Sequence, residues 1–304
     1  KSRSAWSWCG GAIFPTMRSP VAAVLLSGLL WAGPSAAQQY DLRTFSLEAG
    51  LPSASVNDIC EDTEGFLWVA TDQGLARSQG SRFEAFDQQQ GAPGAEATTL
   101  LASTTASGEG VVWTGYRSGL IAMWSKGTLT PFKTNAPLPV FPVRALLPGS
   151  GNTVWLASRG GGVLKVDTTT HAIDPVNNGL PNLRINALVK SNGDVLLAGT
   201  DSGLFQLDDR RWTAAKVNAE LAGRRVLSLF ADSAGVLVGT SEGYLELGAD
   251  LLPLPIAQRF AGYQPLALPH PVVLSVLREN EGDIWLGTSG GLVHLCRSRG
   301  VPTL

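Results

Sequence analysis

Charged side chains are scarce in this 304-residue sequence. They make up 16% of it, against roughly 25% in an average soluble protein, and leave a formal net charge of −2. No run of lysine or arginine is present, so the sequence lacks the basic patch that a nucleic-acid surface needs to neutralise phosphates. The sequence therefore excludes nucleic acid as the expected partner.

Histidine is equally scarce. The three histidines, His171, His270 and His294, are each solitary, without a second ligand at the spacing of a metal site. We therefore expect no metal, and we expect His294, which follows a predicted strand turn, to pack or to form a hydrogen bond.

Catalytic signatures are missing as well. No serine lies in a Gly-x-Ser-x-Gly elbow, and no glycine-rich phosphate loop precedes a predicted helix. The paired acids Glu61-Asp62 and Asp208-Asp209 flank predicted turns, where turn formation and solvation account for them. We predict no catalytic residue, no cofactor and no enzymatic activity in this chain.

Of three cysteines, Cys9 lies near the N-terminus, and Cys60 and Cys296 lie far apart. Two cysteines do not make a disulfide framework. We predict isolated thiols, and a Cys60–Cys296 bridge is the alternative if the fold brings the two ends of the chain together.

The N-terminal region has the pattern of an export signal. Met17-Arg18 supplies a charged start, Val21 to Trp31 is mostly apolar, and Ser35-Ala36-Ala37 supplies small residues before a cleavage point. We predict a signal peptide over residues 17–37, and the alternative is an uncleaved membrane anchor.

Residues 1–16 are interpreted as sequence upstream of the true start and are given no role. Residues 38–304 then form the exported part, which predicts a periplasmic location.

Glycine is abundant and recurs in a repeated pattern. The chain has 35 glycines, well above the usual share of about 7%. The stretch from Gly65 to Leu75, with the sequence GFLWVATDQGL, returns in variant form five more times. The large apolar residue that anchors each copy is Trp68, Trp113, Trp155, Leu197, Leu237 or Trp285. A period of about 40 to 45 residues is typical of a propeller or a solenoid.

Each repeat has the pattern of four short strands joined by tight turns. In the first copy these are residues 55–61, 66–71, 75–78 and 82–86, separated by turns rich in Gly and Asp. Four such antiparallel strands make a propeller blade. The predicted fold is therefore an all-β propeller of four-stranded antiparallel blades, with six repeats in this chain, or a truncated seven-bladed ring as the alternative.

Two further expectations follow from the propeller pattern. The anchor tryptophans are expected to be buried between adjacent blades. The segment from Tyr40 to Phe45 resembles an outer strand, and we expect it to complete the last blade.

Strand direction places the turns between second and third strands on one face of the propeller, together with the loops that lead into each first strand. The side chains at these turns vary between repeats, as binding residues on a fixed scaffold often do. The candidate ligand-binding residues are Asp72, Arg117, Arg159, Asp201, Glu242 and Ser289. Arg117 and Arg159 best suit an anionic or sugar-like ligand, and the alternative for each residue is a solvated turn.

The residues Gly50-Leu51-Pro52, Gly65, Leu67 to Thr71 and Gly74-Leu75 resemble the two-component regulator propeller repeat. The resemblance covers residues from about 40 to 296 and implies an exported sensor region. It also implies a membrane helix and a histidine kinase or diguanylate cyclase downstream. The expected partners are an extracytoplasmic small molecule or glycan and a membrane-linked output domain, and a homodimer is left open.

Two other functions are kept as alternatives. One is a propeller enzyme that acts on carbohydrate as a lyase or hydrolase, and the other is a platform for another protein.

Overall fold

The computed structural model describes residues 44–105, 107–254, 268, 270–279 and 283–295. The chain divides into two units, residues 1–44 and 45–304, and all the described strands belong to the second. The predicted signal peptide, the upstream segment and Cys296 lie outside the described residues, so these predictions stay untested.

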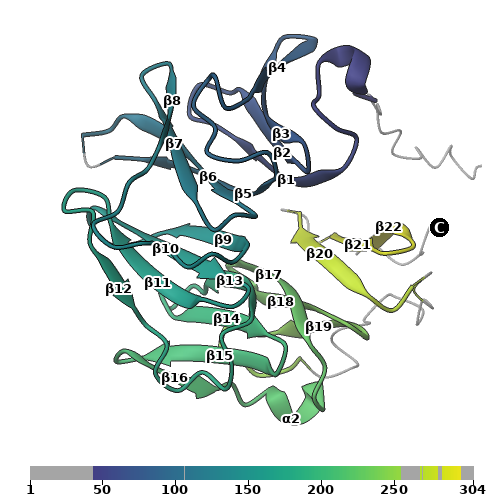
Figure 1. The fold of residues 1–304 in the computed structure, drawn as a ribbon. Helices are drawn as coiled ribbons and strands as arrows, with labels where there is room; N and C mark the ends of the chain where they lie inside the picture. Colours follow the sequence, from purple (N-terminus) through teal and green to yellow (C-terminus); the bar gives the residue numbers. More distant parts are fainter. Residues whose placement is uncertain (1–43, 106, 255–267, 269, 280–282, 296–304) are drawn as a thin grey trace, which may run out of the picture. The chain divides into compact units, whose positions relative to one another are not determined.

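The described residues from 45 to 295 form an all-β propeller of six antiparallel blades arranged in a ring, as predicted (Figure 1). Four blades have four described strands and the last two have three. The inner strand of each blade packs against the inner strand of the next, through the series β1, β5, β9, β13, β17 and β20.

The strands of the first three blades have the following bounds: β1 (Val56–Glu61), β2 (Leu67–Thr71), β3 (Gly74–Gln79) and β4 (Arg82–Phe86); β5 (Ala97–Thr104), β6 (Gly110–Tyr116), β7 (Ile121–Ser125) and β8 (Thr128–Pro131); β9 (Val143–Pro148), β10 (Thr153–Ser158), β11 (Gly162–Asp167) and β12 (Ile173–Pro175).

The last three blades contain β13 (Ile185–Lys190), β14 (Leu196–Thr200), β15 (Gly203–Asp208) and β16 (Arg211–Ala214); β17 (Val226–Asp232), β18 (Gly235–Thr240) and β19 (Gly243–Leu247); β20 (Val273–Arg278), β21 (Ile284–Thr288) and β22 (Gly291–Leu295). Helix in the described residues is limited to η1 (Leu47–Ala49) and α2 (Asn218–Leu221). None of the described helices is long and apolar enough to cross a membrane.

A buried threonine explains the repeated Thr-x-x-Gly sequence after the second strand. The Thr71 hydroxyl donates to the carbonyl of Gly74 at 2.8 Å and accepts from the backbone N–H of Gln73. Gly74 has a φ of 154°, which side chains disfavour. The same threonine bond recurs at Thr200, Thr240 and Thr288. The motif therefore fixes the turn between the second and third strands.

Every inner strand carries an irregularity in the same place. The pairing with the second strand shifts by one residue at the start of β1, β5, β9, β13, β17 and β20. The extra residues are Asn57, Thr98, Arg144, Asn186, Leu227 and Leu274. Because a bulge re-aims the side chain of its extra residue, the fold presents one variable side chain per blade near the start of each inner strand.

The anchor residues lie in the core, with two exceptions. Trp68 is fully buried in a cluster that includes Leu100 and Val112 of the second blade, which confirms packing between blades. Trp113 is likewise buried against the third blade. Trp155 and Trp285 are only half-buried, so the predicted full burial was wrong for these two. Trp155 nevertheless packs against the core cluster of the fourth blade, as expected for a ring between blades. These rings lie against polar neighbours: His294 stacks on Trp285 at 3.9 Å, and Lys165 lies over Trp155.

Of the segment that was expected to complete the last blade, the structure describes Thr44 and, at its end, Phe45. Its ring packs edge-on against Phe83 of β4 at 5.3 Å, and it is not part of a strand. Phe45 therefore belongs to the first blade, and the other residues of that segment, 40–43, lie outside the described residues.

Candidate ligand-binding face

The candidate residues lie on the face of the propeller where the inner strands begin, here called the entry face. At five of the six turns between the second and third strands, the first turn residue bonds to the segment before the inner strand. Asp72, Arg117 and Arg159 donate their backbone N–H groups to Ser55, Glu96 and Pro142, at 3.0–3.3 Å. Ser241 and Ser289 make the same bond to Arg225 and Val272. The structure therefore brings these turns to one face.

The fifth blade requires a correction. Ser241, and not Glu242, makes the bond that Asp72 and Arg117 make in their blades. Glu242 instead matches Gln73 and Ser202, because its N–H donates to the turn threonine. The prediction was off by one residue because the fifth copy has Ser241 and Glu242 between Thr240 and Gly243. Either a serine or a glutamate could occupy the variable position of the turn.

Several of the candidates are held by partners. Arg117 pairs with Glu96 at 2.9 Å, and Glu242 pairs with Arg224 at 3.3 Å.

In the fourth blade, Asp201 accepts from the Asn186 amide at 2.9 Å and lies 3.6 Å from Arg184. In the sixth, the hydroxyl of Ser289 bonds to His270. In the first, Asp72 has a buried carboxylate oxygen without a hydrogen-bond partner in the described residues. These residues thus differ in how much of their hydrogen-bonding capacity is left for a ligand.

Four arginines gather on the entry face over the second to fourth blades. Arg117 and Arg159 come from the turns, Arg144 is the bulge residue of β9, and Arg184 forms an isolated backbone bridge with Arg159. We call these four residues the arginine surface, and all four are exposed. Loss of hydration lowers the pKa of Arg144, the charges of Arg159 and Arg117 lower it further, and Glu96 opposes them. The charges of Arg159 and Arg117 thus act on Arg144.

The charges on the arginine surface are only partly balanced. Glu96 and Asp201 pair with Arg117 and Arg184. Neither Arg144 nor Arg159 forms an ion pair with any residue in the described part of the chain. The arginine surface therefore carries more positive than negative charge among the described residues.

Sequence reasoning missed Arg144 and Arg184. Arg184 lies in the segment before an inner strand, which the topology had placed on this face, so it could have been found. Arg144 could not, because nothing in the repeat marks the bulge that re-aims it.

Exposed apolar side chains lie beside the arginine surface. They are Leu120 (44% exposed), Val140 (83%), Phe141 (46%) and Leu183 (41%). We call these four residues the apolar strip.

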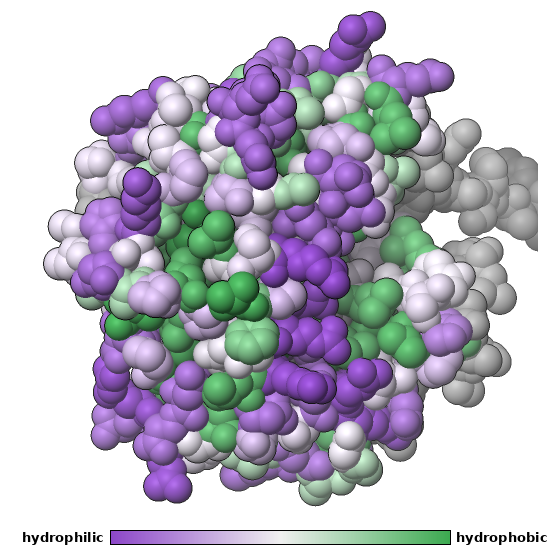
Figure 2. Space-filling model, in the orientation of Figure 1, coloured by the Kyte–Doolittle hydropathy of each residue, from purple (hydrophilic) through white to green (hydrophobic). Residues whose placement is uncertain are grey.

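Close backbone approaches hold the strip against the arginine-bearing turns. A Cβ on Gly119 would meet the Pro139 carbonyl at 2.1 Å, and one on Gly160 would meet the Phe141 ring at 2.6 Å. The carbonyl of Leu183 accepts from Gly160 and Gly162. Figure 2 shows a face on which strongly hydrophilic side chains form a band over the middle of the ring, with a hydrophobic patch beside it.

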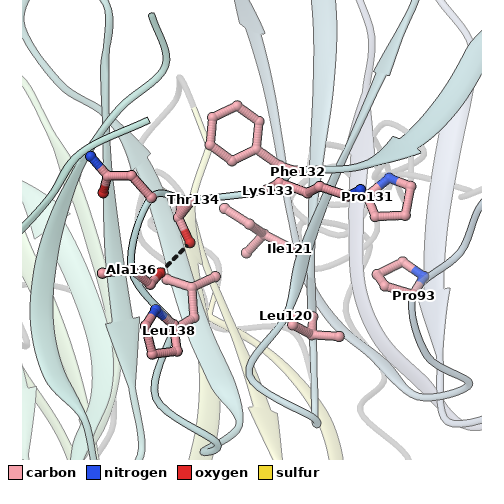
Figure 3. A pocket seen from close by; sticks show the side chains of 11 residues that line it. Pro93, Leu120, Ile121, Pro131, Phe132, Lys133, Thr134, Ala136 and Leu138 are labelled. Carbon is pink, nitrogen blue, oxygen red and sulfur yellow. Dashed lines mark hydrogen bonds between the residues drawn. The ribbon is translucent and has the colours of Figure 1, made fainter. Parts of the chain in front are cut away.

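A pocket of about 480 Å³ opens behind Leu120 (Figure 3). Its walls come from Pro93, from Leu120 and Ile121, and from the segment 131–138 between β8 and β9. Phe132, on that segment, packs between Trp113 and His171. This volume falls within the range of small-molecule sites, about 300–1,000 Å³.

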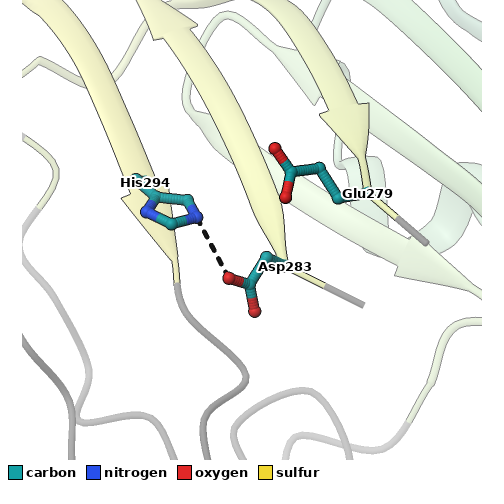
Figure 4. A group of neighbouring side chains, drawn as sticks. All are labelled: Glu279, Asp283 and His294. Atoms are coloured by element: carbon teal, nitrogen blue, oxygen red, sulfur yellow. Dashed lines mark ion pairs between the residues drawn. The ribbon is translucent and has the colours of Figure 1, made fainter. Parts of the chain in front are cut away.

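A second cluster lies in the sixth blade, away from the entry-face turns (Figure 4). Ligand atoms of Glu279, Asp283 and His294 lie within 4.8 Å of one another. His294 is therefore not solitary in space. Its Nε2 is 3.1 Å from Asp283, it stacks on Trp285, and the Trp285 indole N–H donates to Glu279 at 2.7 Å. His294 thus packs on Trp285 and lies beside Asp283, as expected for this residue.

Cys60 is a free thiol. Burial raises its pKa to about 12, with Asp58 and Asp62 contributing. A thiol with so high a pKa is a poor nucleophile.

A family model described as two component regulator propeller matches residues 50–73, which confirms the resemblance at the first repeat. A comparison by sequence with the curated proteins finds no match.

Among solved structures, the extracellular domain of a protein described as a one component system of B. thetaiotaomicron matches with a TM-score of 0.63 at 19% identity. The match covers 80% of this chain and 33% of that one. Two further extracellular-domain structures from the same organism, one of them of that same protein, are described as hybrid two component systems and match with TM-scores of 0.53 and 0.55 at 17% identity. They cover 84% and 86% of this chain. The chain spans 33–42% of the length of these three structures.

A streptogramin B lyase matches with a TM-score of 0.62 at 14% identity, and the match covers 81% of both chains. At these identities the likenesses show the fold and not the activity.

Proposed function

Because its first repeat is a two component regulator propeller repeat, we propose that this chain is an extracytoplasmic sensor domain that binds an anionic ligand on its entry face. The bound state would pass to a membrane-linked kinase or cyclase. Support for the location comes from the B. thetaiotaomicron structures, which are extracellular domains of signalling proteins, and from the export pattern of residues 17–37.

The arginine surface is the observation that carries the proposal. A chain with a net charge of −2 gathers four arginines over three adjacent blades, and two of them have no acidic partner among the described residues. Guanidinium groups bind carboxylate, sulfate and phosphate groups through paired hydrogen bonds. Arg144 and Arg159 would contact the ligand directly. Arg117 and Arg184 would join them at the cost of weakening their pairs with Glu96 and Asp201.

Thermal-shift measurements with a ligand panel test the proposal. The panel contains citrate, an oligogalacturonate and a neutral maltooligosaccharide of equal length. We expect the two anions to raise the melting temperature at low salt, less so as salt screens the charges, and the neutral sugar to have no effect.

Variants locate the site. Arg144→Gln and Arg159→Gln should each reduce the shift, whereas Arg210→Gln should not, because Arg210 lies in the turn between β15 and β16 on the opposite face. An equal effect of all three variants, or a shift with the neutral sugar alone, would count against the proposal.

The lyase likeness over 81% of both chains favours one other function, that of a propeller lyase. The two differ in outcome: a lyase would consume the ligand that stabilises it, whereas a sensor would return it unchanged. Chromatography of each stabilising ligand after prolonged incubation separates them. The output domain is tested by reading the gene beyond Leu304, where the proposal expects a membrane helix and a kinase or cyclase.

A further inference from the structure

We infer that the ligand of the entry face is an amphiphilic organic anion, whose charged group meets the arginine surface and whose apolar part enters the pocket behind Leu120. The inference rests on the proposed function, because it names the ligand class for the same face. It rejects a fully hydroxylated sugar acid as the preferred ligand.

The pocket and the arginine surface share one structural element. Arg117 and Leu120 belong to the same short turn between β6 and β7, three residues apart. Leu120 lines the pocket, and Arg117 is exposed at the other end of the turn. One small molecule can therefore contact both.

The pocket wall is mostly hydrocarbon. Pro93, Ile121, Phe132 and Leu138 supply apolar surface, and Leu120 is 44% exposed at the rim. An exposed apolar pocket of this kind has little to offer the hydroxyl groups of a sugar, whereas it gains free energy by removing an alkyl chain or an aromatic ring from water.

The wall is held in place before any ligand arrives. The backbone N–H of Phe132 donates to Ile121 at 2.9 Å, and the Thr134 hydroxyl donates to the Ala136 carbonyl at 2.7 Å (Figure 3). The N–H of Asn135 donates to His171 on the third blade. A preformed pocket costs little ordering on binding.

A cation also lies at the pocket itself. Lys133 lines it, is exposed, and forms no ion pair with the residues that the structure describes. Lys133 thus gives the apolar pocket a positive charge at its margin, and Arg117, paired with Glu96, lies on the turn that ends at Leu120. A neutral apolar molecule would leave the charge of Lys133 unused. Charge complementarity therefore selects an anion with an apolar tail.

The test is a chain-length series of alkyl carboxylates, acetate, butanoate, hexanoate and octanoate, with octanamide as the neutral match. Dissociation constants are measured by ligand-observed NMR titration at low salt. Each methylene that leaves water improves affinity by up to about fourfold, from about 0.8 kcal/mol each. We expect at least about a tenfold gain from butanoate to octanoate, and weaker binding of octanamide.

Three variants test whether the pocket behind Leu120 causes the chain-length dependence. Leu120→Ser and Ala136→Phe, which open and fill the pocket, should flatten the chain-length dependence and leave acetate binding unchanged. Leu252→Ser is the matched control, because Leu252 is 41% exposed and follows β19 on the opposite face. Both leucines are exposed, so both variants should fold, which circular dichroism checks.

The outcomes separate the two claims. If all carboxylates bind equally regardless of chain length, the inference is wrong and the anion site stands. If length dependence survives in Leu120→Ser and Ala136→Phe, the tail binds elsewhere and the inference is again wrong. If neither these carboxylates nor citrate and oligogalacturonate bind, the proposed function itself fails.

Discussion

The side-chain amide of Asn186 donates to the carbonyl of Val226, 2.9 Å away on the inner strand of the next blade. Asn186 is the bulge residue of β13. Asn57 and Thr98 occupy the same position in the first and second blades and bond to Ala97 and Val143, also across a blade interface. The side chain of the bulge residue thus forms a hydrogen bond that links adjacent blades. Arg144 holds the same position, and no such bond to the fourth blade is present among the described residues.

Removal of this hydrogen bond between blades should destabilise the propeller. Asn186 is 7% exposed and bonds to both Val226 and Asp201, so Asn186→Leu leaves two acceptors without their donor. We expect a loss of about 1–3 kcal/mol in the free energy of unfolding, measured by urea denaturation. The more exposed Asn57→Leu should cost less, and an equal or greater loss there would contradict the argument.

The anchor tryptophans should differ in their contribution to stability. Trp68 is fully buried, stacks on Phe86, and donates its indole N–H to Asp62 at 2.8 Å. Trp68→Ala should cost about 3–5 kcal/mol. Trp285→Ala should cost clearly less, because its half-buried ring leaves a smaller cavity. Denaturant titrations of the two variants would refute this ranking if Trp285→Ala proved the more harmful.

Tyr116, unlike Trp68, carries a group whose removal should not destabilise the protein. It replaces the turn threonine in the second blade, is fully buried, and its hydroxyl has no hydrogen-bond partner among the described residues. Because a buried unpaired hydroxyl costs free energy, Tyr116→Phe should leave stability unchanged or raise it by about 1 kcal/mol. A marked drop in melting temperature would reveal a partner for the hydroxyl.

Asp62 should contribute to acid sensitivity. Burial acts to raise its pKa, but hydrogen bonds from Trp68, Phe66 and Glu64 and the charge of Arg77 together outweigh burial and lower it. A carboxyl whose pKa is lowered by folding stabilises the protein above its unfolded pKa of about 3.9, and that contribution is lost as pH falls through the folded value.

Asp62→Asn should therefore lower the free energy of unfolding at pH 7, and its difference from the wild type should shrink below about pH 4. Urea titrations at a series of pH values provide the measurement. A difference that stays constant down to pH 2 would show that the loss comes from packing alone.

The repeat was readable from the sequence because its causes are local. The Thr-x-x-Gly turn needs a hydroxyl at Thr71 and a positive φ at Gly74. The glycine recurs in all six copies and the threonine in four of them. Strand direction then follows from the turns, which is why the entry-face turns could be grouped without coordinates.

Contacts that depend on the tertiary structure could not be predicted from the repeat sequence. Nothing local distinguishes Trp68 from Trp285, yet one is buried between blades and the other stacks on His294. The position of Arg144 depends on a backbone bulge, and its neighbours Arg117 and Arg159 come from turns in the second and third blades. The pocket behind Leu120 depends on how the segment 131–138 returns to the second blade, which the repeat does not encode.

The most direct measurement of the central claim is calorimetric titration of citrate into the wild-type chain and Arg144→Gln at low salt. Arg144 has no protein partner to lose among the described residues, so a change in binding reports on the ligand alone. We predict that citrate binds the wild type and that Arg144→Gln weakens binding by about tenfold or more, as expected for loss of a charged hydrogen bond. Equal affinity of the two proteins for citrate would contradict the account.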